Sequence, residues 1–172
     1  LAPLKKGRQP AITNLKDARE ILHKVDQETA HPATKLAMRI LALTAVRPGT
    51  LITTPWSEFN EIDPQDPVWR IPAQRMKLRL TQKSDENRDH LVPLSKQTMN
   101  AIQVLRSLTG AGPLAFPNTR FAHKPMSENA LGYLLNRAGY HSRHVPHGWR
   151  STFSSVMNEN YPADKAIIDL ML

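Results

Sequence analysis

Apolar residues recur at every third or fourth position through most of the chain, which is the spacing of helices that bury one face. Capping and terminating residues bracket these stretches. Ser95 and Ser127 stand where two helices should begin, and Gly110 and Gly139 stand where they should end. The predicted helices cover residues 14–26, 34–46, 95–110, 127–140, 147–160 and 162–172.

Residues 56–80 break the helical pattern. They contain short β-like pieces on either side of a turn rich in Asp and Pro, at residues 63–67. Residues 90–94 can pair back across the polar turn at 84–89. We therefore expect an α+β fold that is mainly α, with a small three-stranded antiparallel sheet inside a helical domain.

The first twelve residues carry Pro and Lys without periodicity, and they are typical of a linker or of the end of a preceding region. The rest of the 172-residue chain is long enough for one domain with a core. No apolar run is long enough to span a membrane, and no signal-peptide pattern is present.

The net charge of the chain indicates which kind of molecule it binds. Lys and Arg number 23 against 15 Asp and Glu, which gives a net charge of +8 and favours a polyanion such as nucleic acid. Aromatic residues make up only 6%, so a base-stacking platform for single strands is not expected. Cys is absent, which excludes disulfides and thiolate metal sites and is compatible with the cytosol.

Three basic side chains in the first half of the chain are candidates for phosphate chemistry. Arg47 follows an apolar helix, where it could reach outward or could simply complement the helix dipole. Lys77 could protonate an alkoxide leaving group if Arg75 and Arg79 lower its pKa, and Lys83 competes for that role. The alternative for either lysine is a solvated charge.

His147 and Arg150 stand three residues apart where a helix should begin, so they can lie on one face. The planar guanidinium matches phosphate oxygens, and free N–H groups of the helix start add to the same anion site. Histidine can carry a proton near neutral pH. The alternative is that both residues merely lie at the surface, where they are common.

His141, His144 and His147 also recur in steps of three, which raises the question of a metal site. Pro146 disrupts the regular helix that such spacing needs, and no carboxylate follows closely. We therefore expect no metal. We expect His141, His144 and Arg143 to form a polar loop that could face DNA.

Four separated stretches occur in an order that strongly resembles the catalytic domain of tyrosine recombinases, specifically prophage integrases of the P4 type. The resemblance covers nearly the whole chain from about residue 11. The stretches are "LTAVRPGT", "IPAQRMKLR", "HLVPLS" and "HGWRSTF".

The resemblance implies roles for individual residues. Arg47 matches the first catalytic arginine, and Lys77 matches the lysine that protonates the 5′-hydroxyl leaving group. His147 and Arg150 match the H-x-x-R pair. Residues 1–12 are then a linker from a preceding DNA-binding region, and residues 13–172 are the integrase catalytic domain without its C-terminal segment.

The family's reaction is site-specific recombination, used for prophage integration and excision. A tyrosine attacks a DNA phosphate and forms a 3′-phosphotyrosine intermediate, and neither a cofactor nor a metal is required. The implied partner is double-stranded DNA at attachment sites, bound by a tetramer of the full-length protein in the bacterial cytoplasm, in association with the nucleoid. We expect this fragment to be monomeric and not membrane-bound.

Two departures from the family pattern affect the basic site. Thr50 stands where members of this type usually carry an acidic residue, three positions after Arg47. The excursion at residues 80–89 is longer than expected, which leaves the choice between Lys77 and Lys83 open.

The third departure concerns the nucleophile. Tyr133 and Tyr140 precede the H-x-x-R pair, and Tyr161 follows it too soon, so we expect all three to be structural. This fragment is therefore expected to be inactive for covalent cleavage. The alternatives are a non-catalytic DNA-binding prophage remnant and an enzyme like type IB topoisomerases that relaxes DNA. A metal-dependent nuclease is least favoured, because no acidic cluster offers Mg²⁺ ligands.

Overall fold

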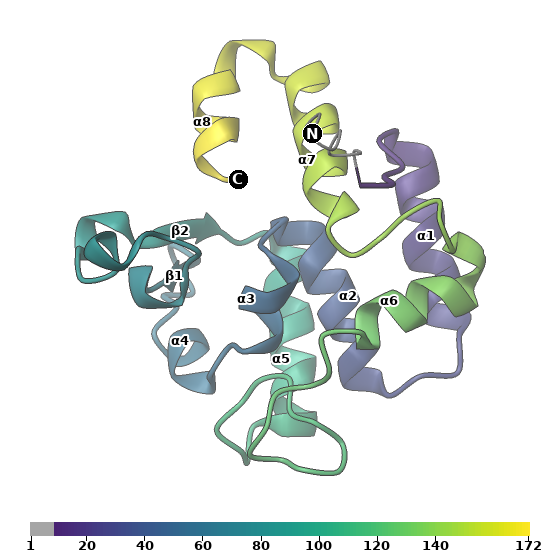
Figure 1. Ribbon diagram of the computed structural model, residues 1–172, viewed down its shortest axis with the longest axis horizontal. Coiled ribbons are helices and arrows are strands. Elements are labelled where there is room, and N and C mark those ends of the chain that lie inside the picture. The colour runs from purple at the N-terminus through teal and green to yellow at the C-terminus, as the bar shows by residue number, and fades with distance from the viewer. Residues whose placement is uncertain (1–8) are drawn as a thin grey trace, which may run out of the picture.

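The computed structural model describes residues 9–172, except for the side chain of Leu80. Most of the chain is helical, and one small sheet lies to the side of the helices (Figure 1). The main elements are α1 (Leu15–Gln27), α2 (Pro32–Thr44), α3 (Pro48–Ile52), α4 (Trp56–Asn60), β1 (Val68–Ile71), β2 (His90–Pro93), α5 (Lys96–Thr109), α6 (Ala130–Leu135), α7 (Gly148–Asn160) and α8 (Lys165–Leu170). Five short helical turns complete the described part of the chain: η1 (Ala73–Arg75), η2 (Leu80–Gln82), η3 (Glu86–Arg88), η4 (Asn136–Tyr140) and η5 (Pro162–Asp164).

Helix α2 is the centre of the core. It packs mainly against α5, and it also contacts α1, α3, α6 and α7. Its residues Ala37, Ile40 and Leu41 are fully buried, as the apolar sequence of this helix predicts. The helix ends at Ala45, whose φ of 52° is left-handed and turns the chain toward α3.

Side-chain caps fix the starts of α1 and α5. The Asn14 side chain accepts a hydrogen bond from the Asp17 N–H at 2.8 Å and begins α1. The Ser95 hydroxyl accepts one from the Thr98 N–H at 3.2 Å and begins α5. The predicted helix at 127–140 is found as α6 followed by the π-type turn η4, in which Gly139 has a φ of 87°.

The sheet has two strands among the described residues, so the prediction of three is wrong. Strands β1 and β2 pair antiparallel, with Ile71 opposite His90. Pro72 follows β1 and lacks an N–H for the ladder, and the chain then forms the turns η1, η2 and η3 in place of a further strand. The predicted mainly helical α+β class is confirmed.

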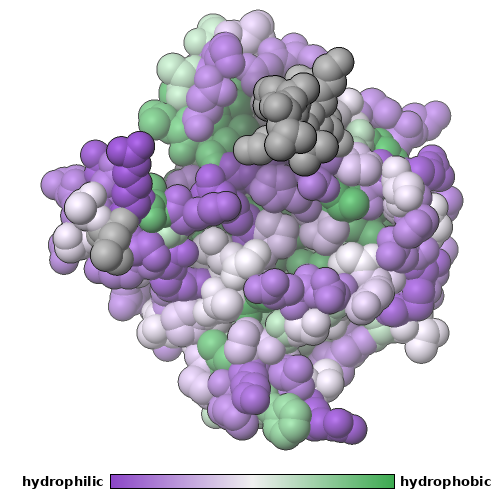
Figure 2. Space-filling view, viewed as in Figure 1, coloured by the Kyte–Doolittle hydropathy of each residue, from purple (hydrophilic) through white to green (hydrophobic). Residues whose placement is uncertain are grey.

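Within residues 9–172, no helix is long and apolar enough to cross a membrane. Two apolar side chains of α8, Ile167 and Leu170, point into solvent, while Ile168 is buried. Figure 2 shows hydrophobic side chains gathered near α8, on a face that is otherwise mostly hydrophilic.

Candidate active site

Arg47 lies in the turn between α2 and α3. It occupies the N-cap position of α3 in an extended conformation, between the left-handed Ala45 and the first helical residue, Pro48. Its side chain is partly buried. The two rigid helices on either side therefore fix where its guanidinium can reach.

The first turn of α7 meets this same turn of the chain. The Arg150 guanidinium donates a hydrogen bond from Nη1 to the carbonyl oxygen of Ala45 at 2.8 Å. His147 is the residue just before α7 and is exposed, whereas Arg150 is partly buried. The structure thus brings Arg47 together with His147 and Arg150, which follow it by about a hundred residues in the chain.

The pKa shifts of these residues reflect their closeness. Burial, reinforced by the charge of Arg47, lowers the pKa of Arg150 to about 10. Burial also lowers the pKa of His147, and the charges of Arg150 and Arg47 lower it further. His147 is therefore neutral at pH 7 and can accept a proton, while Arg150 remains charged.

A second histidine, which the sequence reasoning did not single out, lies beside the two arginines. His90 begins β2 and is partly buried, and its pKa is lowered by burial first and then by the charges of Arg150 and Arg47. The sequence offered one signal, because His90 opens the stretch "HLVPLS" on which the resemblance partly rests. The residue pattern of that stretch by itself predicts a strand and gives His90 no role in the site.

Both candidate lysines face the same hollow. A cavity of about 900 Å³ is lined by Arg47, His147, Lys77 and Lys83, among others. Lys77 is exposed and lies between η1 and η2, in a turn rather than on a strand. The choice between Lys77 and Lys83 therefore stays open.

Arg75, expected to be a cationic neighbour of Lys77, is held by other groups. Its Nη1 forms an ion pair with the carboxylate of Glu58, whose other oxygen accepts the Trp69 indole N–H at 2.9 Å. Its Nη2 donates to the carbonyl oxygen of Thr50 at 2.6 Å. The charge of Arg75 is thus compensated, and its side chain ties the lysine-bearing turn to α3.

A second hollow, of about 710 Å³, shares His147 with the first. Arg150 also faces it, together with hydroxyl groups of α7. Residues 9–11 and Thr13 form another part of its lining. Its α7 hydroxyl residues are Ser151, Ser154 and Ser155.

The loop before α7 differs from the prediction in one respect. His141 and Arg143 are exposed as expected, but His144 is only 1% exposed and cannot face DNA. Among the described residues, no three His, Cys, Asp or Glu side chains are grouped as a metal site. Tyr140 is buried and Tyr161 is exposed, and neither they nor Tyr133 line the two hollows.

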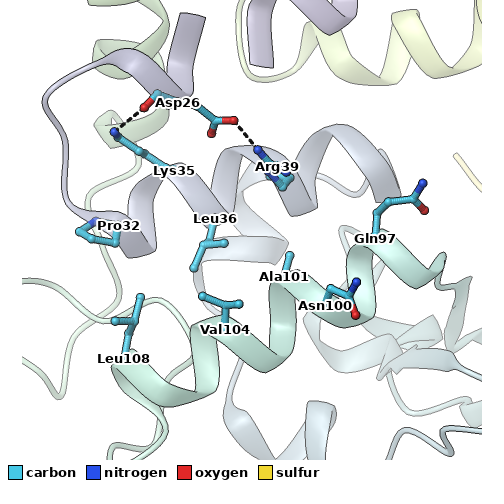
Figure 3. Close-up of a pocket in the computed structure, with 10 residues that line it drawn as sticks. All are labelled: Asp26, Pro32, Lys35, Leu36, Arg39, Gln97, Asn100, Ala101, Val104 and Leu108. Atoms are coloured by element: carbon cyan, nitrogen blue, oxygen red, sulfur yellow. Dashed lines mark hydrogen bonds and ion pairs between the residues drawn. The ribbon is translucent and has the colours of Figure 1, made fainter. Parts of the chain in front are cut away.

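A groove away from this site is lined by residues of α2 and α5, which pack against each other (Figure 3). Alkyl groups form its floor, and Lys35 and Arg39 lie along one side, where both are bound by Asp26 of α1. None of the four candidate catalytic residues lines this groove. Arg39 is therefore a paired arginine outside the candidate active site.

Comparison with known proteins identifies the family. Residues 12–171 match the phage integrase family, whose members are tyrosine recombinases, and the chain belongs to it. Prophage integrase IntZ of Escherichia coli (strain K12) is 38% identical over 124 residues, which cover 72% of this chain and 28% of that protein. The integrase of Enterobacteria phage P4 is 32% identical over 74% of this chain and 30% of its own length. The chain spans well under half the length of these relatives.

Two solved structures share the fold. The integrase of transposon Tn1549, in complex with transposon right end DNA, superposes with a TM-score of 0.71 at 14% identity, over 97% of this chain and 59% of that one. A lambda integrase dimer bound to a COC′ core site gives a TM-score of 0.65 at 17% identity, over 96% of this chain and 45% of that one. At these identities, the likeness shows the fold alone.

Proposed function

We propose that this domain supplies the phosphate-binding residues for site-specific DNA strand cleavage and rejoining, for prophage integration and excision, through a 3′-phosphotyrosine intermediate. One observation carries the proposal: Arg47, His147 and Arg150 converge beside the cavity that Lys77 also lines. Family membership and the fold support it. The proposed partner is double-stranded DNA, for which the net charge of +8 is suited.

The residues have separate roles in the proposed reaction. The two guanidinium groups of Arg47 and Arg150 bind the non-bridging oxygens of the scissile phosphate, where negative charge builds up in the transition state. A tyrosine hydroxyl attacks phosphorus, and its proton passes to neutral His147. The bond from phosphorus to the 5′-oxygen breaks, and Lys77 or Lys83 protonates that oxygen.

In this scheme the protein's own cationic side chains supply the positive charge that the transition state needs. Fixed cations aimed at a developing anion act without reorganisation, and removal of one such donor costs on the order of 10²–10³ in rate. The phosphotyrosine bond keeps the energy of the phosphodiester, so rejoining needs no nucleotide. We further propose that residues 1–12 link this domain to a DNA-binding region and that the protein acts in the bacterial cytoplasm.

The proposal is tested with the product of the whole gene and its host attachment site. Incubation with a nicked attachment-site duplex should give a covalent protein–DNA adduct that survives denaturation. Arg150→Ala should lower the rate of adduct formation by about 10²–10³. Arg39→Ala, which removes a paired arginine beside the groove of Figure 3, should leave the rate unchanged.

Other outcomes would distinguish the alternative functions. DNA binding without any adduct would favour a non-catalytic DNA-binding remnant. Relaxation of supercoils at any sequence would favour an activity like that of type IB topoisomerases. An adduct formed by residues 1–172 alone and lost in Tyr161→Phe would contradict the assignment of Tyr161 as structural.

A further inference from the structure

The segment that precedes α1 lies against the start of α7. We propose that this N-terminal segment (residues 9–13) is a wall of the active site, and that His144 holds it there and so positions His147 and Arg150. The inference rests on the proposed function for the roles of His147 and Arg150. The contact itself depends only on the described geometry.

Three hydrogen bonds attach the N-terminal segment to the region around α7. The Ile12 N–H donates to Nδ1 of His144 at 3.1 Å, and the Thr152 hydroxyl donates to the Ile12 carbonyl oxygen at 2.6 Å. The Val145 N–H donates to the carbonyl oxygen of Pro10 at 3.3 Å. These bonds join residues more than 130 positions apart, so they are set by the tertiary structure and not by local sequence.

His144 has the properties of a positioning residue. Its ring is buried and packs edge-on against Trp149, with 4.5 Å between ring centroids. Burial lowers its pKa to about 4, so the ring is neutral at pH 7 and Nδ1 is free to accept from Ile12. Nε2 then carries the proton, and it is buried with no hydrogen-bond partner among the described residues.

That unpaired N–H argues against a role for His144 in packing alone. A buried polar group without a partner opposes folding, and an apolar side chain of similar size would avoid this cost. The acceptor at Nδ1 is the one thing that an apolar side chain cannot supply. The hydrogen bond from Ile12 is therefore what His144 contributes beyond an apolar side chain of similar size.

Gly148 shows how closely the N-terminal segment approaches α7. A Cβ atom at this position would lie 2.7 Å from the carbonyl oxygen of Pro10 and 3.2 Å from Cε1 of His144. Because the first of these atoms belongs to the backbone, no side-chain movement relieves the contact. Gly148 stands directly between His147 and Trp149, so the contact lies within the H-x-x-R sequence itself.

The N-terminal segment also forms part of the lining of both hollows. Gln9 lines the cavity that holds Arg47 and Lys77, and it lines the second hollow beside Arg150 as well. His147 is the other residue common to both linings. The Gln9 amide can donate to a phosphate oxygen, so displacement of this segment would both open the site and release the start of α7.

The variants that test the proposal distinguish the hydrogen-bond acceptor at Nδ1 of His144 from the packing of its ring. His144→Asn places an oxygen near the position of Nδ1 and keeps an acceptor for Ile12, whereas His144→Leu fills space without one. Thr152→Val removes the second bond to Ile12 at nearly constant shape. Thr98→Val is the matched control, because Thr98 is also a buried threonine and its hydroxyl pairs with Ser95, the N-cap of α5.

Two measurements on the 172-residue chain report whether His147 and the start of α7 keep their positions. The first is a titration with inorganic phosphate, followed by the NMR shift of the His147 imidazole. The second is hydrogen exchange at the amides of residues 148–152. His144→Leu and Thr152→Val should lower the affinity for phosphate about threefold to tenfold and speed amide hydrogen exchange in this turn. The amides of α5 should stay protected from exchange. His144→Asn and Thr98→Val should match the wild type.

Three results would overturn the proposal. In the first, His144→Leu changes neither phosphate affinity nor local exchange. In the second, His144→Asn and His144→Leu are equally impaired, so that the ring and not the acceptor matters. In the third, exchange speeds up equally in α5, as a general loss of stability requires. If the wild-type chain binds no phosphate, the proposed function fails, and local exchange alone decides the inference.

Discussion

At the scale of single residues, the site depends on side chains whose charge states the fold sets. His147 and His90 are held neutral by burial and by the two neighbouring guanidinium groups, Arg47 and Arg150. A phosphate that enters the cavity would offset those positive charges. We therefore expect phosphate to raise the pKa of both imidazoles, which makes them natural reporters of the bound anion.

His144 predicts how stability depends on pH. Its folded-state pKa is about 4 and its ordinary value is 6.5, so the unfolded chain takes up a proton first as the pH falls. The stability that neutral His144 contributes is complete above pH 6.5 and is lost between pH 6.5 and about 4. Between pH 7.5 and 5, the wild type should lose about 2 kcal/mol more than His144→Asn in urea unfolding. An equal loss in both proteins would contradict the burial of a neutral ring.

At the scale of elements, the Arg75 side chain joins the two parts of the chain that carry Arg47 and Lys77. Arg75 belongs to η1, two residues before Lys77, and it bonds to α3, which begins directly after Arg47. Glu58 of α4 holds the Arg75 guanidinium in place. The Thr50 carbonyl oxygen accepts the hydrogen bond from Arg75, three residues after Arg47.

This arrangement predicts a large effect from a small change. Glu58→Gln leaves the Arg75 guanidinium, which is 19% exposed, without its counter-charge, and it should lower the free energy of unfolding by about 3 kcal/mol. Asp169→Asn breaks the exposed Lys165–Asp169 pair of α8 and should cost less than about 1 kcal/mol. Chemical denaturation measures both, and similar values would show that the Glu58 pair is not energetically distinct.

At the scale of the whole molecule, the excess of Lys and Arg should appear as salt-dependent DNA binding. If several cations of the site neutralise phosphates, the logarithm of duplex affinity should fall with the logarithm of salt at a slope of about −3 to −5. Arg47→Ala should reduce the slope by about one, and Arg39→Ala should not change it. Fluorescence anisotropy with a labelled 30-base-pair duplex measures these slopes. A slope near zero would contradict phosphate contacts.

The sequence predicted the helices well, because periodicity, caps and prolines act over a few residues. The capping residue Ser95 predicts the start of α5, and it caps that helix in the structure. The predicted third strand was wrong because Pro72 ends the ladder and short turns follow.

The sequence by itself determined which residue types are present for phosphate chemistry, and the order of its four stretches indicated the family. Only the tertiary structure decided which of those residues meet. Arg150 reaches the turn of Arg47, His90 joins them from a strand, and His144 is buried under the N-terminal segment instead of facing DNA. The physical reason is the distance along the chain over which each kind of interaction acts. Helix signals act over neighbouring residues, whereas these contacts join positions separated by about a hundred residues and arise only when the core packs.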